Sequence, residues 1–276
     1  MNTTIKDPLD AGLIRAAMAP AVLAKLGQLT LLQETDSTNT AVLRLPGDRQ
    51  HAHAVLAEQQ TGGRGRRQRS WHSPPGGNIY LSLGWWFRKN DWPLSTLPLV
   101  AAVAVCRALS RASLQGHGIK WPNDILAGGK KLAGILVELQ SSGAGPAFAV
   151  VGVGLNVRMP QADQDALKQA IDRPWTDLAS AMKDGSPGIS RNRLVALLLE
   201  ELLGALACFE ASGFEAFSQA WRELDLLQGR KILLEQNGRQ ISGEACGVDQ
   251  NGGLLLETVA SGVQVFHSGE VSVRYG

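Results

Sequence analysis

The sequence is poor in cysteine, and the few cysteines form no recognisable pattern. Only Cys106, Cys208 and Cys246 are present, an odd number at wide separations. Such a set excludes a disulfide framework and a C-x-x-C metal pair, so we expect three buried thiols in a reducing compartment. The five histidines also lack the spacing of a metal site such as H-E-x-x-H, and we predict no protein-bound metal.

An excess of charge of one sign is missing as well. The chain has 27 basic and 25 acidic residues, a net charge of +2. A general polyanion binder carries a large cationic excess, so any recognition of anions has to be local.

Targeting and membrane-spanning segments are absent from the sequence pattern. The first 30 residues contain Lys6, Asp7, Asp10 and Arg15 in place of the apolar core of a signal peptide. No apolar run approaches the roughly 18 residues needed to cross a bilayer. We therefore expect a cytoplasmic protein that does not associate with a membrane.

What is present is enough apolar sequence for a sizeable core. The chain has 276 residues, 44% of them apolar, and its strands and helices follow one another in irregular order. This predicts a mixed α+β main domain over 1–228, and a doubly wound sheet is disfavoured. After Gly229 the sequence has short strands between Asn-Gly and Ser-Gly turns, which predicts a small β-barrel domain over 229–276.

The expected elements of the main domain can be given by residue range. Helices are expected over 10–27, from near Thr38, and over 95–112, 190–210 and about 213–225. A long connection around one short helix is expected over 158–188. Strands are expected over 29–32, 53–60, 78–87, 118–126, 131–140 and 147–157, the last of them central in the sheet.

The stretch "TGGRGRRQRSW", residues 61–71, concentrates four arginines and three glycines in a nearly neutral chain. Its glycines let backbone amides approach a ligand, and its arginines offer forked donors suited to phosphate or carboxylate. It matches neither the P-loop nor the dinucleotide fingerprint. A solvated basic loop is the alternative that composition alone leaves open.

Two further motifs follow each other closely. "KWPND" places Lys120, Asn123 and Asp124 at the end of a strand, although a capped β-turn would explain this stretch equally well. "KLAGILVE" then carries Lys131 into an apolar strand, where it suits neutralisation of a bound anion or serves as an ordinary strand-end lysine.

Glycine and polar residues mark two more candidate contacts. "VGVGLNV" puts Gly152 and Gly154 inside a strand, which is costly unless a ligand or another backbone comes close. Asn156 at its end can read an adenine edge or cap the strand. "TDSTN" can read a polar ring or cap a helix. No Ser-His-Asp signature is present, and no spacing supports Asp36 with Glu58 as an acid/base pair, so we exclude hydrolysis by a triad.

Taken in order, "STN", "EQQTGGRGRRQRSW", "KWPNDI", "KLAGILVE", "VGVGLNV" and a C-terminal "SGEVSVR" closely resemble the bacterial biotin protein ligases. The resemblance runs from about residue 30 to the end of the chain. It implies the catalytic fold shared with class II aminoacyl-tRNA synthetases, followed by an SH3-like barrel. It also implies a reaction in which biotin and Mg-ATP form biotinoyl-5′-AMP, and a lysine of a biotin carboxyl carrier protein or domain then displaces AMP.

The resemblance assigns roles by motif position. Catalytic roles fall to Lys131, Arg66 and Asp124. Biotin binding is assigned to Ser37, Thr38, Asn39, Gln60, Gly63, Arg64, Gly65, Arg66, Lys131 and Gly134. ATP binding is assigned to Arg64, Arg67, Trp71, Lys120, Asn123, Asn156, Trp175 and Arg274.

One departure from many bacterial members concerns DNA. Those members carry an N-terminal winged helix-turn-helix and act as repressors, whereas here about 30 residues precede the first motif strand and no basic recognition helix is visible. We expect a monofunctional ligase that does not bind DNA. Nucleic-acid binding by the arginine loop and lipoate ligation or octanoyl transfer are the alternatives, and a homodimer, known for some members, remains open.

Overall fold

The structure is a computed structural model that describes residues 7–89, 91–141, 145–160, 163, 174–182, 188–236, 239–267 and 271–275. Its helices are α1 (Ala11–Ala17), α2 (Pro20–Leu23), α3 (Thr38–Leu43), α4 (Leu97–Arg111), α6 (Leu178–Ala181), α7 (Arg191–Ser212) and α8 (Ser218–Leu224). The strands of the main domain are β1 (Gln28–Thr35), β2 (His53–Gln60), β3 (Ile79–Phe87), β4 (His117–Lys120), β5 (Asp124–Ala127), β6 (Lys130–Ser141) and β7 (Ala147–Leu155). Five shorter strands follow: β8 (Lys231–Gln236), β9 (Arg239–Val248), β10 (Leu254–Thr258), β11 (Gly262–Phe266) and β12 (Val271–Tyr275).

The main domain is built on a seven-stranded sheet with strand order β1-β2-β3-β7-β6-β5-β4. Strands β1 and β2 are parallel, and the other neighbouring pairs are antiparallel. The sheet is therefore mixed, as the irregular order of elements predicted. Strand β7 lies in the middle, which explains its almost continuous apolar sequence.

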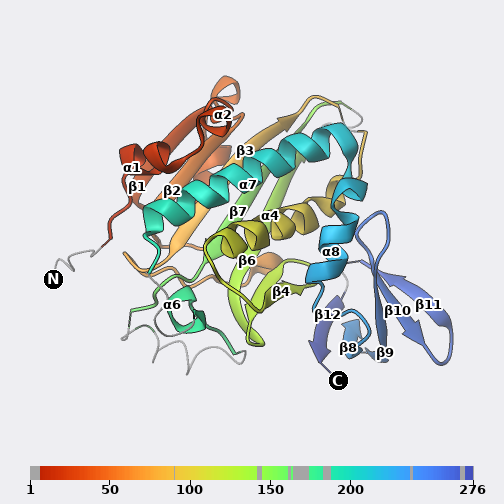
Figure 1. Cartoon of the computed structure of the whole chain (residues 1–276). Helices are drawn as coiled ribbons and strands as arrows, with labels where there is room; N and C mark the ends of the chain where they lie inside the picture. The colour runs from red at the N-terminus through yellow and green to blue at the C-terminus, as the bar shows by residue number, and fades with distance from the viewer. Residues whose placement is uncertain are drawn as a thin grey trace.

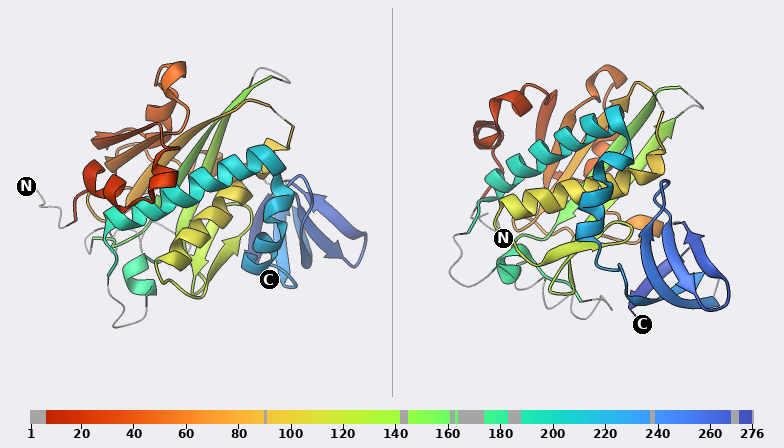
Figure 2. Two further views of the ribbon diagram at one scale, coloured as in Figure 1. Left: turned by 45° about the horizontal axis from the view of Figure 1, so that its top comes forward. Right: turned by 45° about the vertical axis from the view of Figure 1, so that its right-hand side comes forward.

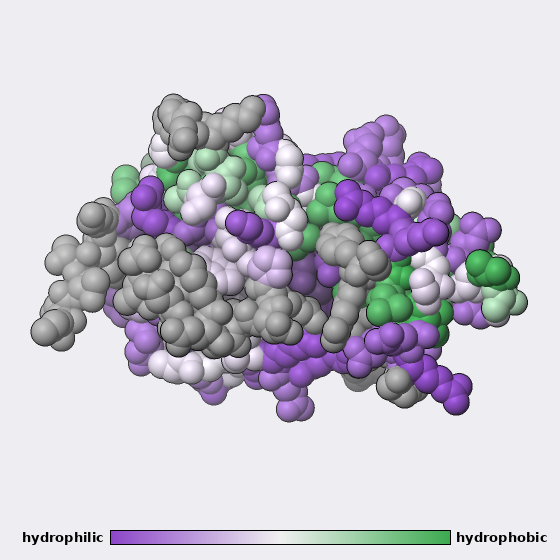
Figure 3. Space-filling model, turned by 90° about the horizontal axis from the view of Figure 1, so that it is seen from below, coloured by the Kyte–Doolittle hydropathy of each residue, from purple (hydrophilic) through white to green (hydrophobic). Residues whose placement is uncertain are grey.

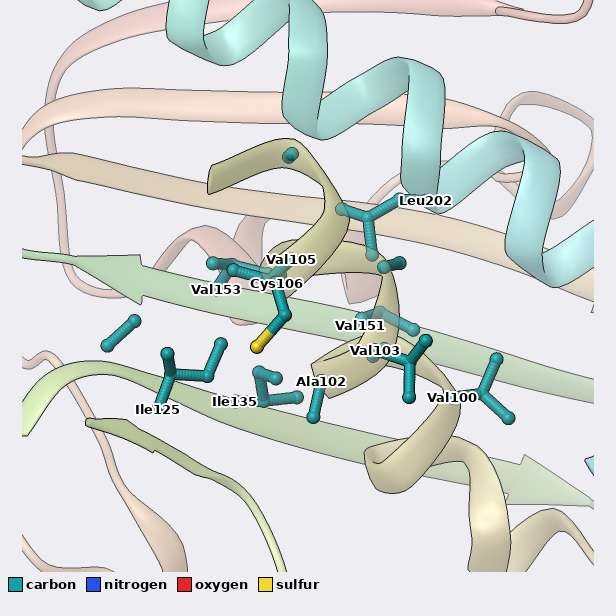
Figure 4. Packing of buried hydrophobic residues seen from close by; sticks show 14 of the residues in the cluster. Val100, Ala102, Val103, Val105, Cys106, Ile125, Ile135, Val151, Val153 and Leu202 are labelled. Carbon is teal, nitrogen blue, oxygen red and sulfur yellow. The ribbon is translucent and has the colours of Figure 1, made fainter. Parts of the chain in front are cut away.

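Two helices cover one face of this sheet. Figures 1 and 2 show α4 and α7 lying side by side across it, with the N-terminal helices near one end of α7 and the C-terminal strands at the other. Eleven of the fifteen residues of α4 are buried, because the helix packs against the sheet on one side and against α7 on another. Figure 4 shows this packing, in which side chains of α4 meet those of α7 and of the sheet at Leu202, Ile125, Ile135, Val151 and Val153.

The segment 94–111, which contains α4, is long and apolar enough to cross a membrane, contrary to the reading of the sequence. Two thirds of it, 67%, is buried inside the protein. The apolarity of α4 is accounted for by its position in the core.

The C-terminal strands form a five-stranded antiparallel sheet with the order β11-β10-β9-β8-β12. Its turn between β9 and β10 contacts the main domain. There the indole nitrogen Nε1 of Trp121 donates to the carbonyl of Gly252 (3.0 Å), and the hydroxyl of Ser95 donates to the carbonyl of Asn251 (2.9 Å). Gly252 has a φ of 79°, a left-handed backbone conformation that glycine adopts more easily than other residues. Figure 3 shows apolar surface at this end of the molecule, where the β10–β11 hairpin exposes Val259, Val263 and Val265.

Three expectations were wrong in detail. The stretch 118–126 is not one strand: Trp121, Pro122 and Asn123 form a turn that reverses the chain, so β4 and β5 make an antiparallel hairpin. Residues 10–27 form two short helices, because Pro20 begins a new one. Only Cys106 of the cysteines is buried. Cys208 is exposed and Cys246 half-buried, and all three are free thiols.

Candidate functional site

A cavity of about 520 Å³ lies where the arginine loop, α3, the β4–β5 turn and the strands β6 and β7 meet. Most of the predicted site residues line it: Ser37, Thr38, Asn39, Gln60, Arg64, Gly65, Arg66, Arg67, Trp71, Lys120, Asn123, Asp124, Lys131, Gly134, Asn156 and Trp175. Two predicted site residues remain, Gly63 and Arg274, and Gly63 does not line the cavity. The side chain of Arg274 lies outside what the structure describes. Residues more than a hundred positions apart in sequence are thus brought to one site.

The floor of the cavity is a patch of glycine on the central strands. Gly134 of β6 is paired with Gly154 of β7, and Gly152 is the next residue of β7 on the same face. A Cβ added to Gly154 would lie 2.6 Å from the Trp71 ring, and one on Gly152 would lie 2.2 Å from Asn39 Oδ1. The glycines of "VGVGLNV" are therefore required by side chains that lie flat on the sheet.

Hydroxyl and amide groups line the end of the cavity near α3. The backbone N–H of Thr38 donates to Gln60 Oε1 (2.9 Å), and Gln60 Nε2 donates to Ser73 Oγ (3.0 Å). Thr38 and Ser37 are both buried. Helix α3 begins at Thr38, but the Ser37 side chain makes no capping hydrogen bond. Recognition of a polar group by "TDSTN" stays a prediction.

The arginine loop forms a small closed hairpin over the cavity. Trp71 donates its backbone N–H to Gly63 (2.8 Å), and Gly65 donates to Arg69 (2.6 Å). Arg67 has a φ of 57°, a left-handed conformation that is uncommon outside glycine. This geometry directs the neighbouring arginines apart: Arg64 reaches Glu138 on β6 and Arg66 reaches the β4–β5 turn.

The cationic centre of the site is at the β5–β6 hairpin. Lys131 Nζ forms an ion pair of 2.6 Å with Asp124 Oδ1 and lies 5.2 Å from the centre of the Trp71 ring. Arg66 Nη1 donates to Asn123 Oδ1 (3.3 Å). Burial lowers the pKa of the Arg66 guanidinium, while the charge of Asp124 raises it. Two cations are thereby held beside one carboxylate, an arrangement suited to binding anions.

The strand end after β7 forms the far side of the cavity. Asn156 is buried, and its amide donates to the carbonyl of Thr176 (3.0 Å). The backbone of Lys131 bonds to both Pro174 and Thr176, so Trp175 lies beside it. The rest of the predicted long connection, 161–162, 164–173 and 183–187, lies outside the described residues.

The donor set of the cavity suits an anionic substrate better than a resident metal. Among the described residues that line it, Asp124 is the only carboxylate, and it is already paired with Lys131. The described part of the chain holds no group of three or more His, Cys, Asp or Glu residues that could bind a metal ion. Mg²⁺ therefore fits as part of Mg-ATP, held mainly by phosphate oxygens.

Several residues of the site were missed by sequence reasoning. Tyr80 and Val153 line the cavity, yet their strands look like ordinary core sequence. Val273 of β12 also lines it and is the described contribution of the C-terminal sheet. Glu138 anchors the loop from a strand that reads as buried. Only the pairing of strands, which is not visible in one sequence, places these residues together.

Comparison with known proteins agrees with this geometry. Residues 31–156 match the biotin/lipoate A/B protein ligase family, and residues 228–274 match the biotin protein ligase C terminal domain. The chain is 34% identical over 263 residues to the bifunctional ligase/repressor BirA of Escherichia coli, covering 95% of this chain and 79% of that protein. It is 32% identical over 276 residues to the biotin–[acetyl-CoA-carboxylase] ligase of Mycobacterium tuberculosis, covering 97% and 96%.

A solved structure shares the same architecture. The biotin protein ligase from Aquifex aeolicus in complex with biotin and ATP superposes with a TM-score of 0.74 at 28% identity, over 90% of this chain and 99% of that one. Both family models match in the expected order, and full-length relatives align along nearly the whole chain. The chain therefore belongs to the biotin protein ligase family.

Proposed function

We propose that this chain activates biotin with Mg-ATP and transfers it to a lysine of a biotin carrier protein, as a biotin–[acetyl-CoA-carboxylase] ligase. A carboxylate oxygen of biotin attacks the α-phosphorus of ATP, and pyrophosphate leaves. The amine of the acceptor lysine then attacks the acyl carbon, AMP leaves, and the amine loses a proton. The observation that carries the proposal is the cavity in which Lys131, Arg66 and the polar residues at α3 face one another.

The chemistry requires two anions to approach each other. The biotin carboxylate and the triphosphate repel, so the enzyme has to supply cations and N–H donors where they meet. Lys131 and Arg66 supply the cations, and Asp124 holds the ammonium group of Lys131 in place until substrate arrives. The loop glycines expose backbone N–H groups to the same point, and no enzyme nucleophile is needed.

The two ends of biotin meet different surroundings. Thr38 and Gln60 present hydroxyl and amide groups that complement a ureido ring, which both donates and accepts hydrogen bonds. Asn156 and the rings of Trp71 and Trp175 are the groups available for an adenine. An alkyl chain, as in lipoate or octanoate, would leave the polar end unpaired, which disfavours those substrates.

The test is biotin-dependent exchange of pyrophosphate into ATP. Lys131→Ala and Arg66→Ala should each lower exchange by at least about 100-fold while far-UV circular dichroism stays unchanged. Lys130→Ala is the matched control, because this neighbouring lysine is exposed and outside the cavity. Exchange retained in both variants would contradict the proposal.

Binding partners form the second part of the proposal. The chain acts on biotin carrier proteins in the cytoplasm and binds neither DNA nor membranes. The near-neutral charge supports this. A gel-shift titration with duplex DNA at low salt checks it: micromolar binding that weakens steeply with salt would overturn this part.

A homodimer is proposed through the edge of β6. Strand β5 pairs with β6 as far as Gly134 and Asn123 bonds to Ile135, so among the described residues the segment 137–141 is paired with no further strand on that side. An open edge is a surface that a second copy can extend. Analytical ultracentrifugation with and without biotin and ATP tests this, and a monomer under all conditions would contradict it.

A further inference from the structure

Glu138 is a carboxylate on the site face of an otherwise apolar strand. On β6, Gly134, Leu136 and Glu138 alternate on the face toward α3, whereas Ala133 and Ile135 pack into the core beneath α4. The side chain of Glu138 is only 32% exposed. Partial burial of a charged group is unfavourable unless hydrogen bonds or opposite charges compensate it. The groups that contact the Glu138 carboxylate therefore indicate its role.

Glu138 contacts two predicted site residues that are far apart in the sequence. Its Oε2 accepts a hydrogen bond from Asn39 Nδ2 at 2.6 Å. Arg64 Nη2 lies 3.2 Å from both Oε1 and Oε2, and the same nitrogen donates to Thr40 Oγ1 at 3.0 Å. One carboxylate thus joins α3 to the arginine loop.

The carboxylate also fixes the orientation of buried groups. An ionised carboxylate only accepts, so the amide nitrogen of Asn39 has to face Glu138 and its oxygen has to face Ser82. Ser82 Oγ lies 2.6 Å from Asn39 Oδ1 and 2.7 Å from Thr38 Oγ1. Ser82 Oγ thus links Asn39 to Thr38, and Thr38 Oγ1 donates to Gln60 Oε1 at 3.2 Å. The polar chain therefore runs from Glu138 to the end of the cavity assigned to the ureido ring.

On the other side, Glu138 provides a side-chain anchor for the loop. Arg64 reaches Glu138, while Arg66 reaches Asn123 across the cavity. The Arg64–Glu138 pair is too exposed to add more than about 1 kcal/mol to folding stability. Its geometric effect is larger, because it determines where the loop lies over the biotin end of the cavity.

We propose that Glu138 is a positioning residue that couples closure of the arginine loop to the ureido end of the biotin pocket. The inference rests on the proposed function. Glu138 touches no reacting atom. It orients the Asn39 amide and holds Arg64 at once, so that the polar end of the pocket and the loop adopt their binding geometry together. Of the residues assigned to ATP, Arg64 contacts Glu138, and Arg64 is also assigned to biotin, so we expect the larger effect on biotin.

The test compares the full-length variants Glu138→Gln and Gln140→Ala. A glutamine has the same shape but no charge, and its NH2 group would face a donor: the Arg64 guanidinium if it takes the place of Oε1, or also the Asn39 amide nitrogen if it takes the place of Oε2. Gln140 follows on the same face of β6 and is exposed, which makes it the matched control. For Glu138→Gln we expect the calorimetric Kd and the KM for biotin to rise about tenfold, with the KM for ATP changed less than about twofold. Gln140→Ala should leave all three unchanged.

Three results would overturn the inference in different ways. Unchanged biotin binding in Glu138→Gln would remove the positioning role and leave the proposed function intact. Equal increases in both KM values together with a lower Tm would assign Glu138 to general stability. Failure of the wild-type chain to exchange pyrophosphate with biotin would refute the proposed function itself.

Discussion

Gly154 and Gly152 leave space on β7 that two other side chains fill. The Trp71 ring rests on Gly154, and the Asn39 amide rests on Gly152. In the interior of a strand glycine costs stability, and here the cost is offset by the close approach of groups that belong to the site. The geometry of the cavity floor therefore depends on the absence of two methyl groups.

Gly154→Ala should weaken biotin and ATP binding without unfolding the chain. The new Cβ would lie 2.7 Å from Trp71 Nε1, so the ring has to move off the strand pair. We expect at least about a tenfold loss in kcat/KM, equal to about 1.4 kcal/mol. Steady-state pyrophosphate exchange measures it.

Gly204→Ala is the matched control for this prediction. Gly204 lies in α7 with no atom within 4 Å of an added Cβ. Alanine there should raise stability by about 0.5–1 kcal/mol and leave activity unchanged. Equal activity of both variants would show that the glycine floor is unimportant.

Single residues differ in how well the sequence predicts them. Lys131 and Asn123 were found because their short motifs can be recognised locally. The predicted positions of most site residues agree with the cavity, although their roles stay predictions. Glu138 was missed, because its partners Asn39 and Arg64 are 99 and 74 residues away and only the fold brings them together.

Among the elements, α7 is fixed to β2 by a buried ion pair. Arg191 Nη2 lies 2.7 Å from Glu58 Oε2, and the two side chains are 3% and 5% exposed. Glu58 also accepts from the backbone N–H of Leu9 (2.8 Å). Glu58 therefore has a structural role. It does not line the cavity, and no spacing in the sequence supports it as an acid/base partner of Asp36.

Glu58→Gln should lower the free energy of unfolding by about 3 kcal/mol, because it leaves the Arg191 charge buried without its carboxylate partner. Urea unfolding followed by circular dichroism measures the change. Glu201→Gln, in the more exposed pair with Arg111, should cost less than about 1 kcal/mol. Similar losses in both variants would contradict the distinction.

The arginine loop is the element most open to change on binding. Residues 63–71 make backbone hydrogen bonds within the loop, whereas Thr61 and Gly62 bond to Thr35 and Asp36, and the Arg64 side chain is 44% exposed. We predict that trypsin cleaves near Arg66 in the free protein and several-fold more slowly with biotin bound, because closing the loop protects it. Cleavage at the exposed Lys25 serves as the internal control. Equal rates at Arg66 with and without biotin would refute this prediction.

Elements with a clear hydrophobic period were predicted correctly, including α7 and the central β7. The strand expected over 118–126 was wrong, because Ile119 and Ile125 suggested one extended run. In the structure they face each other across the β4–β5 hairpin. Local composition does not reveal such a reversal when the turn carries functional residues.

For the whole molecule, the junction between the two sheets contains a half-buried acid, Asp225. Asp225 follows α8 and bridges to Ile119 of β4, and its Oδ2 has no hydrogen-bond partner in the described structure. Burial raises the pKa of Asp225, although the backbone N–H of Leu227 lowers it. A raised folded-state pKa means that the protonated form is favoured, so stability is lost as pH rises through that pKa.

Asp225→Asn should therefore raise Tm more at pH 7 than near pH 4, because pH 4 is close to the ordinary Asp pKa of 3.8 and the raised pKa keeps more of the folded-state carboxyl protonated there. Differential scanning fluorimetry at the two pH values measures it. Asp48→Asn, at an exposed position, should show no such difference. A gain at pH 4 as large as at pH 7 would contradict the assignment.

The contact between the C-terminal sheet and the main domain depends on main-chain atoms of the β9–β10 turn. Trp121 and Ser95 both donate to backbone carbonyls, those of Gly252 and Asn251. A carbonyl is present whatever side chain its residue carries. During divergence the turn can therefore change in sequence while keeping the contact, provided that its shape is retained. Exchange of this domain between family members should accordingly tolerate sequence changes in the turn, while β12, whose Val273 lines the cavity, has to stay compatible with the site.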